Sequence, residues 1–318
     1  MSLVERALNK LKAAQPSPAP RSVSPAPVRV GRVVDVQRQV TQSDELPQPR
    51  LTIGNGIRTV RIDHEALRTS GFLPPERHER ELAHQFRTIK RPLIRHAFPA
   101  DSSGFGLSRS TGRSIMVSSA LPGEGKTFTA INLALSLAME KDYAVLLVDG
   151  DVAKPNVSQI FGAAGEPGLL DVLTDPSRQV ESVVLSTDTP RLSLLPAGTR
   201  SEQATELLAS ARMRQVLGNL ERLDPHLLIV VDSPPVLLTS ESRVLAGLFE
   251  QVLLVVRAGA TQQQAVLDAL AAIGEKPGLR LILNQATHVG PAGNYYGYGY
   301  GYGYLPGETG ATTQAGKS

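Results

Sequence analysis

The sequence of 318 residues contains no cysteine and no tryptophan, and only 4% of its residues are aromatic. The lack of cysteine excludes disulfides, thiol catalysis and thiolate-bound zinc, and it favours a reducing, cytoplasmic setting. No apolar run approaches the roughly 18 residues that a membrane-spanning helix needs, and the opening MSLVERALNKLKAA does not resemble a secretory signal. The formal net charge of +3 is too small to argue for a nucleic-acid partner. We therefore expect a soluble intracellular protein.

The few aromatic residues are distributed very unevenly. Six of the seven tyrosines lie in one stretch near the C-terminal end, whereas a packed core would scatter them. The sequence around them, residues 291–318, is rich in glycine and of low complexity, so we expect it to be a disordered tail. The clustered tyrosines, the candidate phosphoacceptors of this chain, are Tyr295, Tyr296, Tyr298, Tyr300, Tyr302 and Tyr304.

The first third of the chain suggests helices joined by a linker. Residues 1–14 are predicted to form an amphipathic helix, and 15–60 a Pro-rich linker followed by a segment without a clear pattern. Residues 61–112 are predicted to be a helical extension with a helix from about 75 to 98, which Pro92 should end or kink. The remainder of that helix is basic, including Arg87, Lys90 and Arg91, and we interpret it as a solvated or oligomer-forming face.

From 113 to 290, short apolar runs alternate with helical patterns. Such continuous apolar strands, separated by helices, are typical of a parallel sheet covered on both faces. The fold class predicted for this domain is therefore α/β, doubly wound, with a mostly parallel sheet. The runs expected to be buried strands are 114–119, 144–149, 192–197, 226–232, 251–256 and 279–284, with a helix near 126–140.

The sequence ALPGEGKT, residues 120–127, directly follows the first of these strands and precedes a helix. It matches the P-loop pattern, with alanine in place of the first glycine. Gly123 and Gly125 allow backbone N–H groups to surround phosphate oxygens, and the helix N-terminus adds partial positive charge. Lys126 would reach the β and γ phosphates of ATP, and the Thr127 hydroxyl would bind Mg²⁺. A simple glycine turn is the alternative. The expected nucleotide-binding residues are Pro122, Gly123, Glu124, Gly125, Lys126, Thr127, Phe128 and Asn284.

Acidic residues follow two other predicted strands. Asp149 ends AVLLVD and is followed by Gly150 and Asp151, and Asp232 ends HLLIVVD. Ligands of open α/β sheets bind at the carboxyl ends of strands, so these carboxylates should meet the P-loop and bind Mg²⁺ with Thr127. A lone aspartate there is more often a cap or turn residue. Asn284, which ends the last strand, is either a contact for the adenine base or a turn residue.

The order of P-loop, VLLVDGDVAKP, LLIVVDSPPV and tyrosine cluster resembles the bacterial tyrosine kinases, which are P-loop autokinases. MSLVERALNKL and QFRTIKRPLI are similar, more narrowly, to the exosortase-associated tyrosine autokinase group of exopolysaccharide loci. The resemblance implies that Asp149 helps to hold Mg²⁺, that Asp151 accepts the tyrosine proton and that Asp232 is the Walker B acid. Where the family usually has two arginines, this chain has Ala153 and Lys154.

The same resemblance has implications for partners and location. It implies a homo-oligomer and, as activator, a membrane polysaccharide co-polymerase (chain-length determinant) that brings a cytoplasmic enzyme to the inner membrane. The family's oligomerisation motif is a glutamate and two arginines spaced by three, and its positions hold His84, Arg87 and Lys90 here.

The expected function is an ATP-dependent protein tyrosine autokinase that modifies its own tail. Each phosphate adds about −1.5 to −2 charges, so we expect the modified tail to be expelled from the acidic site. One alternative is an ATP-switch ATPase of the septum-placement or plasmid-partition type, which carries a second lysine where Leu121 stands here and lacks a tyrosine tail. The other is a non-catalytic ATP-binding module of a membrane complex.

Overall fold

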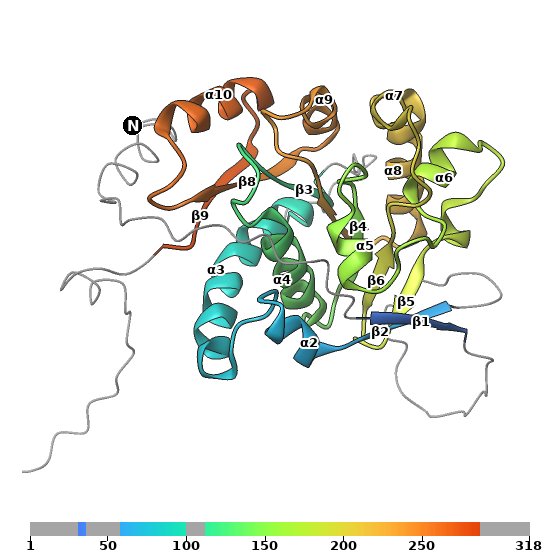
Figure 1. Cartoon of the computed structure of the whole chain (residues 1–318), viewed down its shortest axis with the longest axis horizontal. Helices are drawn as coiled ribbons and strands as arrows, with labels where there is room; N and C mark the ends of the chain where they lie inside the picture. The colour runs from blue at the N-terminus through green and yellow to red at the C-terminus, as the bar shows by residue number, and fades with distance from the viewer. Residues whose placement is uncertain (1–30, 36–57, 100–111, 287–318) are drawn as a thin grey trace, which may run out of the picture. The chain divides into compact units, whose positions relative to one another are not determined.

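A computed structural model of the chain describes residues 31–35, 58–99 and 112–286; for 31–35 it describes the backbone only. The helix predicted at 1–14, the Pro-rich part of the linker and the tyrosine tail lie outside the described residues. The described strands form one sheet in the order β1-β2-β5-β6-β4-β7-β3-β8-β9 (Figure 1). Six of its eight strand pairs are parallel, and only β1–β2 and β5–β6 are antiparallel.

The strands in the middle of the sheet are the apolar runs that the sequence predicted. Their side chains are buried on both faces, because helices cover each face of a mostly parallel sheet. These strands are β3 (Ser114–Ser119), β4 (Ala144–Asp149), β6 (Leu192–Leu195), β7 (Leu227–Asp232) and β8 (Gln251–Arg257). The predicted run at 279–284 forms β9 (Gly278–Asn284), but this strand lies at the edge of the sheet and is mostly only partly buried, so the expectation of a buried strand there is wrong.

Three further strands extend the sheet at one end and were not predicted. They are β1 (Gly31–Asp35), β2 (Arg58–Ile62) and β5 (Leu185–Thr187). The segment from about 29 to 60, to which the sequence assigned no structure, thus supplies β1 and most of β2. Only Val60 and Ile62 of β2 are buried, so the strand is too short and too polar on one side to stand out as an apolar run.

Successive side chains of each strand point to opposite faces of the sheet, so the core has two halves. In β4, Leu146 and Val148 face one half, and Val145 and Leu147 face the other. The first half is covered by α6 (Leu169–Thr174), α7 (Ala204–Leu208), α8 (Ala211–Leu223), α9 (Ser240–Leu248) and α10 (Gln263–Ile273), with the short 3₁₀ turn η2 (Val180–Ser182). The second is covered by α2 (His64–Thr69), α3 (Glu79–Ala97), α4 (Lys126–Ala138) and α5 (Asn156–Ile160), and η1 (Glu76–His78) precedes α3. Helices on both faces confirm the doubly wound α/β prediction.

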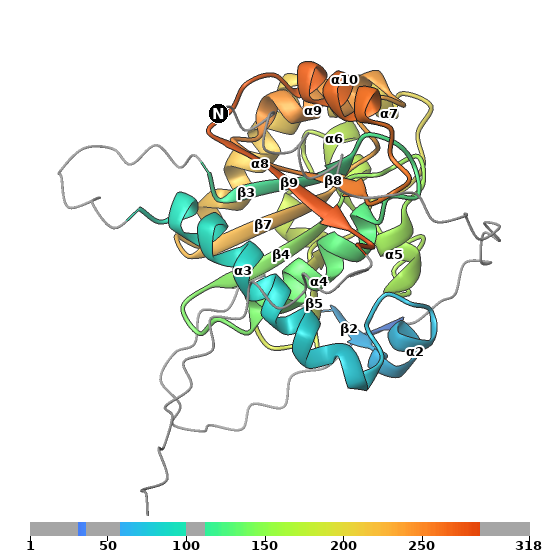
Figure 2. The same ribbon diagram turned by 90° about the vertical axis from the view of Figure 1, so that its left-hand side faces the viewer.

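The long helix α3 lies on the outside of α4 (Figure 2) and corrects one expectation. Of the two effects predicted for Pro92, ending or kinking the helix, the first does not occur, since the helix continues to Ala97. A proline inside a helix costs about 3 kcal/mol, and burial of the neighbouring Phe86, Leu93 and Ala97 offsets this cost. Lys90, which we expected on the basic outer face, is buried instead. Its Nζ donates to the Ser136 carbonyl at 2.6 Å and pairs with Glu140 at 2.7 Å, which joins α3 to α4.

No helix in the described ranges is long and apolar enough to span a bilayer. The strand order places β7 between β3 and β4, and all three run parallel. Their carboxyl ends therefore meet at one edge of the sheet, where ligands of open α/β folds bind. The P-loop and the acidic residues of the sequence analysis all follow these ends.

Candidate nucleotide-binding site

The loop between β3 and α4 has the backbone shape of a phosphate cradle. Gly123 and Gly125 have positive φ angles of 81° and 94°, which residues with a side chain rarely adopt. A Cβ atom on Gly125 would also collide with the Asn284 amide. The helix then begins at Lys126, so its first N–H groups, which have no partner within the helix, point into the loop.

A second layer of contacts holds this loop in place. The buried Glu124 carboxylate accepts hydrogen bonds from the Leu121 N–H at 2.6 Å and from the Thr261 hydroxyl, beyond β8. The Asn284 amide, at the end of β9, donates to the Glu124 carbonyl at 2.8 Å. Both carboxylate oxygens of Glu124 are therefore engaged within the protein, which leaves its backbone N–H as the group that could contact a phosphate. Pro122, at the crest of the loop, is exposed, and Phe128 is half-buried against the core on the α4 side.

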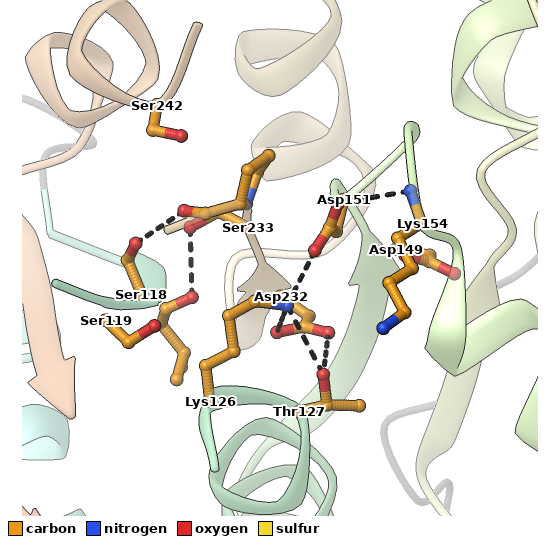
Figure 3. A network of polar contacts seen from close by, with 12 residues as sticks. Ser118, Ser119, Lys126, Thr127, Asp149, Asp151, Lys154, Asp232, Ser233 and Ser242 are labelled. Atoms are coloured by element: carbon orange, nitrogen blue, oxygen red, sulfur yellow. Dashed lines mark hydrogen bonds and ion pairs between the residues drawn. The ribbon is translucent and has the colours of Figure 1, made fainter. Parts of the chain in front are cut away.

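The Lys126 ammonium is the centre of the site. Its Nζ lies 2.6 Å from Asp151 Oδ2 and 3.8 Å from Asp232 Oδ1, as Figure 3 shows. Burial lowers the pKa of Lys126, but the negative charges of Asp232 and Asp151 outweigh burial and leave that pKa above its ordinary value. The lysine is therefore a cation held among carboxylates.

The two strand-end acids lie side by side. Asp149 of β4 and Asp232 of β7 are register partners, and the Gly150 N–H donates to the Asp232 carbonyl at 2.8 Å. A Cβ on Gly150 would lie 2.8 Å from that carbonyl oxygen, so the glycine permits the close approach. The Thr127 hydroxyl donates to Asp232 Oδ2 at 2.7 Å. The structure thus brings the three predicted acids to the P-loop.

Both strand-end carboxylates are fully buried, and this controls their protonation. Burial, and then the charge of Asp232, raises the pKa of Asp149 to about 8. Burial also raises the pKa of Asp232, to about 6, although the charge of Lys126 opposes this rise. At neutral pH the site without nucleotide therefore holds a protonated Asp149 beside an ionised Asp232.

Asp149 has a partner that the sequence analysis missed. Ser158, in α5, donates to Asp149 Oδ2 at 2.7 Å through both its backbone N–H and its hydroxyl. The same hydroxyl accepts the Ala197 N–H at 3.0 Å. Ser158 lies nine positions after Asp149, and no sequence motif connects the two residues. They meet only because α5 brings the serine back to the end of β4.

The oxygen atoms of Thr127, Asp149 and Asp232 fit the Mg²⁺ site that was predicted from the sequence. Asp149 Oδ1 and Asp232 Oδ1 are buried oxygens without a hydrogen-bond partner within the described part of the chain, and Thr127 adds a hydroxyl. Mg²⁺ prefers such oxygens and usually takes one or two carboxylates, with phosphates and water completing its shell. Among the described residues, no three His, Cys, Asp or Glu side chains form a metal cage of their own, so Mg²⁺ here would depend on a bound nucleotide.

The loop after β7 is fixed to the P-loop strand. The Ser233 hydroxyl donates to the Val117 carbonyl at 3.0 Å, and the Ser118 hydroxyl donates to the Pro234 carbonyl at 2.7 Å (Figure 3). Across the site, the Lys154 N–H lies 3.3 Å from Asp151 Oδ1, and its side chain is exposed. Lys154 stands at one of the two positions where the family that the sequence resembles usually has arginine. It therefore provides an exposed cation at the edge of the site. The tyrosine cluster lies outside the described residues.

The sheet, the glycine loop and the strand-end acids together define a P-loop NTPase fold. The chain belongs to the AAA domain family, whose model matches residues 112–273. Its relatives include proteins named as bacterial tyrosine kinases. Tyrosine-protein kinase YwqD of Bacillus subtilis (strain 168) is 32% identical over 161 residues, 51% of this chain and 66% of that protein.

Two further relatives extend the comparison. Succinoglycan biosynthesis transport protein ExoP of Rhizobium meliloti (strain 1021) is 33% identical over 167 residues, 52% of this chain and 21% of ExoP. The solved BceF tyrosine kinase domain has a TM-score of 0.54 at 26% identity, covering 69% of this chain and 86% of that domain. This chain therefore spans 66% of YwqD and about a fifth of ExoP, less than two thirds of either protein.

Proposed function

We propose that this chain is an ATP-dependent protein tyrosine autokinase that transfers the γ-phosphoryl group of MgATP to tyrosines of its own cluster at 295–304. The observation that carries the proposal is the contact of Lys126 with Asp151 at 2.6 Å. It places the P-loop cation next to the carboxylate that the resemblance assigns as base. The relatives named as tyrosine kinases support the choice of reaction.

The residues around the nucleotide would bind the phosphates, neutralise their charge and hold Mg²⁺. The loop from Pro122 to Phe128 would hold the phosphates through its backbone N–H groups, and Lys126 would neutralise charge that develops on the γ-phosphate. Thr127 and Asp232, with the free oxygen of Asp149, would hold Mg²⁺, which supplies positive charge opposite the phosphates. Catalysis of this kind depends mainly on positioning and charge stabilisation.

Asp151 would act on the incoming tyrosine. The phenolic oxygen forms a bond to the γ-phosphorus while the bond from that phosphorus to the bridging oxygen of ADP breaks, and the phenol proton passes to Asp151. Asp151 is paired with Lys126 in the nucleotide-free protein, so the lysine must move toward phosphate before the carboxylate can accept a proton. A positioned base contributes about 10²–10⁴-fold to the rate.

The names of the relatives support a proposal for the cellular role. A protein named for succinoglycan biosynthesis and transport is among them, so we infer that this autokinase regulates the synthesis or export of an exopolysaccharide. Its activator would be a membrane polysaccharide co-polymerase, which would bring the cytoplasmic chain to the inner membrane. If a homo-oligomer forms, Lys90 does not serve its interface as the family motif would, because that side chain is buried against α4.

The test is to incubate the purified chain with ATP and Mg²⁺ and to map phosphate by mass spectrometry. Phosphate on the tail tyrosines of the wild type, absent from the Lys126→Met variant, supports the autokinase. ATP hydrolysis with an unmodified tail would favour the positioning ATPase instead. Nucleotide binding without either reaction would indicate a non-catalytic module.

A further inference from the structure

The outer face of α3 carries an unbroken stripe of basic side chains. At 100° per residue, the positions 80, 84, 87, 91 and 95 fall within a narrow sector of the helix. All of these side chains are exposed, while the opposite side of the helix is buried against the core. The α3 stripe consists of Arg80, His84, Arg87, Arg91 and Arg95.

The charges of the α3 stripe are not used by the fold. None of its five side chains forms an ion pair or a side-chain hydrogen bond within the described ranges. Two other basic residues of the helix differ: Lys90 is paired with Glu140, and His96 lies 3.8 Å from Glu250. Figure 2 shows α3 along the outside of its layer with no other helix covering it. The stripe is therefore a free cationic surface.

The composition and spacing of the stripe indicate the kind of anion that it suits. Four of the five residues are arginine, whose planar guanidinium binds phosphate oxygens through two parallel hydrogen bonds. Along the helix, positions 80 to 95 span about 22 Å, with steps of about 4.5–6 Å. A flat membrane would be better served by cations mixed with protruding apolar side chains. The large apolar residues of this helix, Leu82 and Ile89 among them, pack against the core instead.

The chain itself contains a sequence of matching period. From Tyr296 to Tyr304, tyrosine occupies every second position. In an extended strand, alternate side chains point to one side, about 6.6 Å apart, and five of them span about 26 Å. Phosphorylation would give each about −1.5 to −2 charges. A row of five phosphotyrosines would therefore meet a row of five basic side chains of similar length and spacing.

We propose that the α3 stripe is a docking site for the tyrosine-phosphorylated 295–304 segment of a second copy of the chain. The unmodified segment carries no charge for the stripe to bind, whereas the modified segment is strongly anionic. The stripe would thus bind the phosphorylated product of the reaction and not the unmodified segment, and it would link a modified copy of the chain to a neighbouring copy. This inference rests on the proposed function for the origin of the phosphates, but the binding itself can be tested without catalysis.

The experiment uses synthetic peptides of residues 293–305, carrying a fluorescent label and read by fluorescence anisotropy at 0.15 M salt. One peptide has phosphate on the five tyrosines that occupy every second position from 296 to 304, one has no phosphate, and one has a rearranged sequence with five contiguous phosphotyrosines. The protein is the full chain, purified without ATP and treated with phosphatase. The triple variant Arg80→Gln, Arg87→Gln, Arg91→Gln removes most of the stripe, and Arg200→Gln, Arg214→Gln, Arg243→Gln removes equal charge from other exposed positions.

We expect the alternating phosphopeptide to bind, and the stripe variant to weaken its binding at least about tenfold, since three exposed charge pairs are lost. The control variant should change the affinity by less than about twofold. Equal losses in the two variants, or equal affinity for the contiguous phosphopeptide, would mean that only bulk charge is sensed and would overturn the proposal. So would stripe-dependent binding to vesicles of anionic lipid without binding of the phosphopeptide.

The two proposals can fail separately. Stripe-dependent binding of the synthetic phosphopeptide by a chain that never phosphorylates itself would leave the docking site intact and refute the autokinase. Autophosphorylation without any binding of the phosphopeptide would do the reverse.

Discussion

Replacing Asp149 with asparagine should remove most of the pH dependence of stability in the nucleotide-free protein. Asp149 is fully buried, and burial raises its pKa from 3.8 to about 8. The folded protein therefore keeps a proton on this carboxyl that the unfolded chain releases. This contribution to stability is complete below pH 3.8 and is lost as the pH rises through about 8.

The size of the effect follows from proton linkage. Between pH 5 and pH 7 the folded state holds one more proton at Asp149, so the free energy of unfolding falls by about 1.4 kcal/mol per pH unit, or about 3 kcal/mol in all. Asp232, with its pKa raised to about 6, adds a loss of about 1 kcal/mol in this window. The wild type should lose about 4 kcal/mol and Asp149→Asn only about 1 kcal/mol.

Urea unfolding, followed by circular dichroism at pH 5, 6 and 7 in the presence of EDTA, measures these free energies. Tryptophan fluorescence is not an option, because the chain contains no tryptophan. Asp268→Asn, at an exposed carboxylate of α10, is the matched control and should follow the wild-type slope. Parallel slopes for the wild type and Asp149→Asn would refute the assignment of a protonated, buried Asp149.

Three further substitutions test contacts within the site and between α3 and α4. Gly125→Ala should lower stability by about 1–3 kcal/mol and weaken nucleotide binding, measured by calorimetry, because φ is positive and a Cβ meets Asn284; wild-type affinity would contradict the cradle geometry. Lys90→Met should lower the free energy of unfolding, measured with urea, by about 2 kcal/mol because its contacts to α4 are lost. Arg87→Met, at an exposed position, should lower it by less than about 0.5 kcal/mol. Equal losses in the two variants would place Lys90 on the surface. Ser158→Ala should cost about 2 kcal/mol, because it leaves buried polar groups unpaired, and an unchanged midpoint would argue against its bond to Asp149.

Much of the fold could be predicted because a two-sided parallel sheet leaves a simple pattern. The runs at 144–149 and 227–232 are apolar at every position but the last, and each is buried throughout. The same reasoning failed for β2, where only two of five side chains are buried, and for the three-residue β5. Lys90 was also expected on an exposed face, because helical periodicity in the sequence does not show that this side chain packs against α4.

The candidate site was predictable where it depends on sheet topology. Asp149, Asp151 and Asp232 meet Lys126 because parallel strands end at one edge. The supporting contacts were not predictable, since Ser158 and Thr261 come from elements that only the folded chain brings to Asp149 and Glu124. The pairing of the expected base with the P-loop lysine was missed for the same reason.

The proposed mechanism depends on Lys126 and Asp151, and substitutions at these two residues test it. Phosphate incorporation into the tail tyrosines, quantified by mass spectrometry over time with ATP and Mg²⁺, should be abolished by Lys126→Met and slowed about 10²–10⁴-fold by Asp151→Asn. An Asp151→Asn protein that modifies its tail at the wild-type rate would show that this carboxylate accepts no proton, and the mechanism proposed for the site would be wrong.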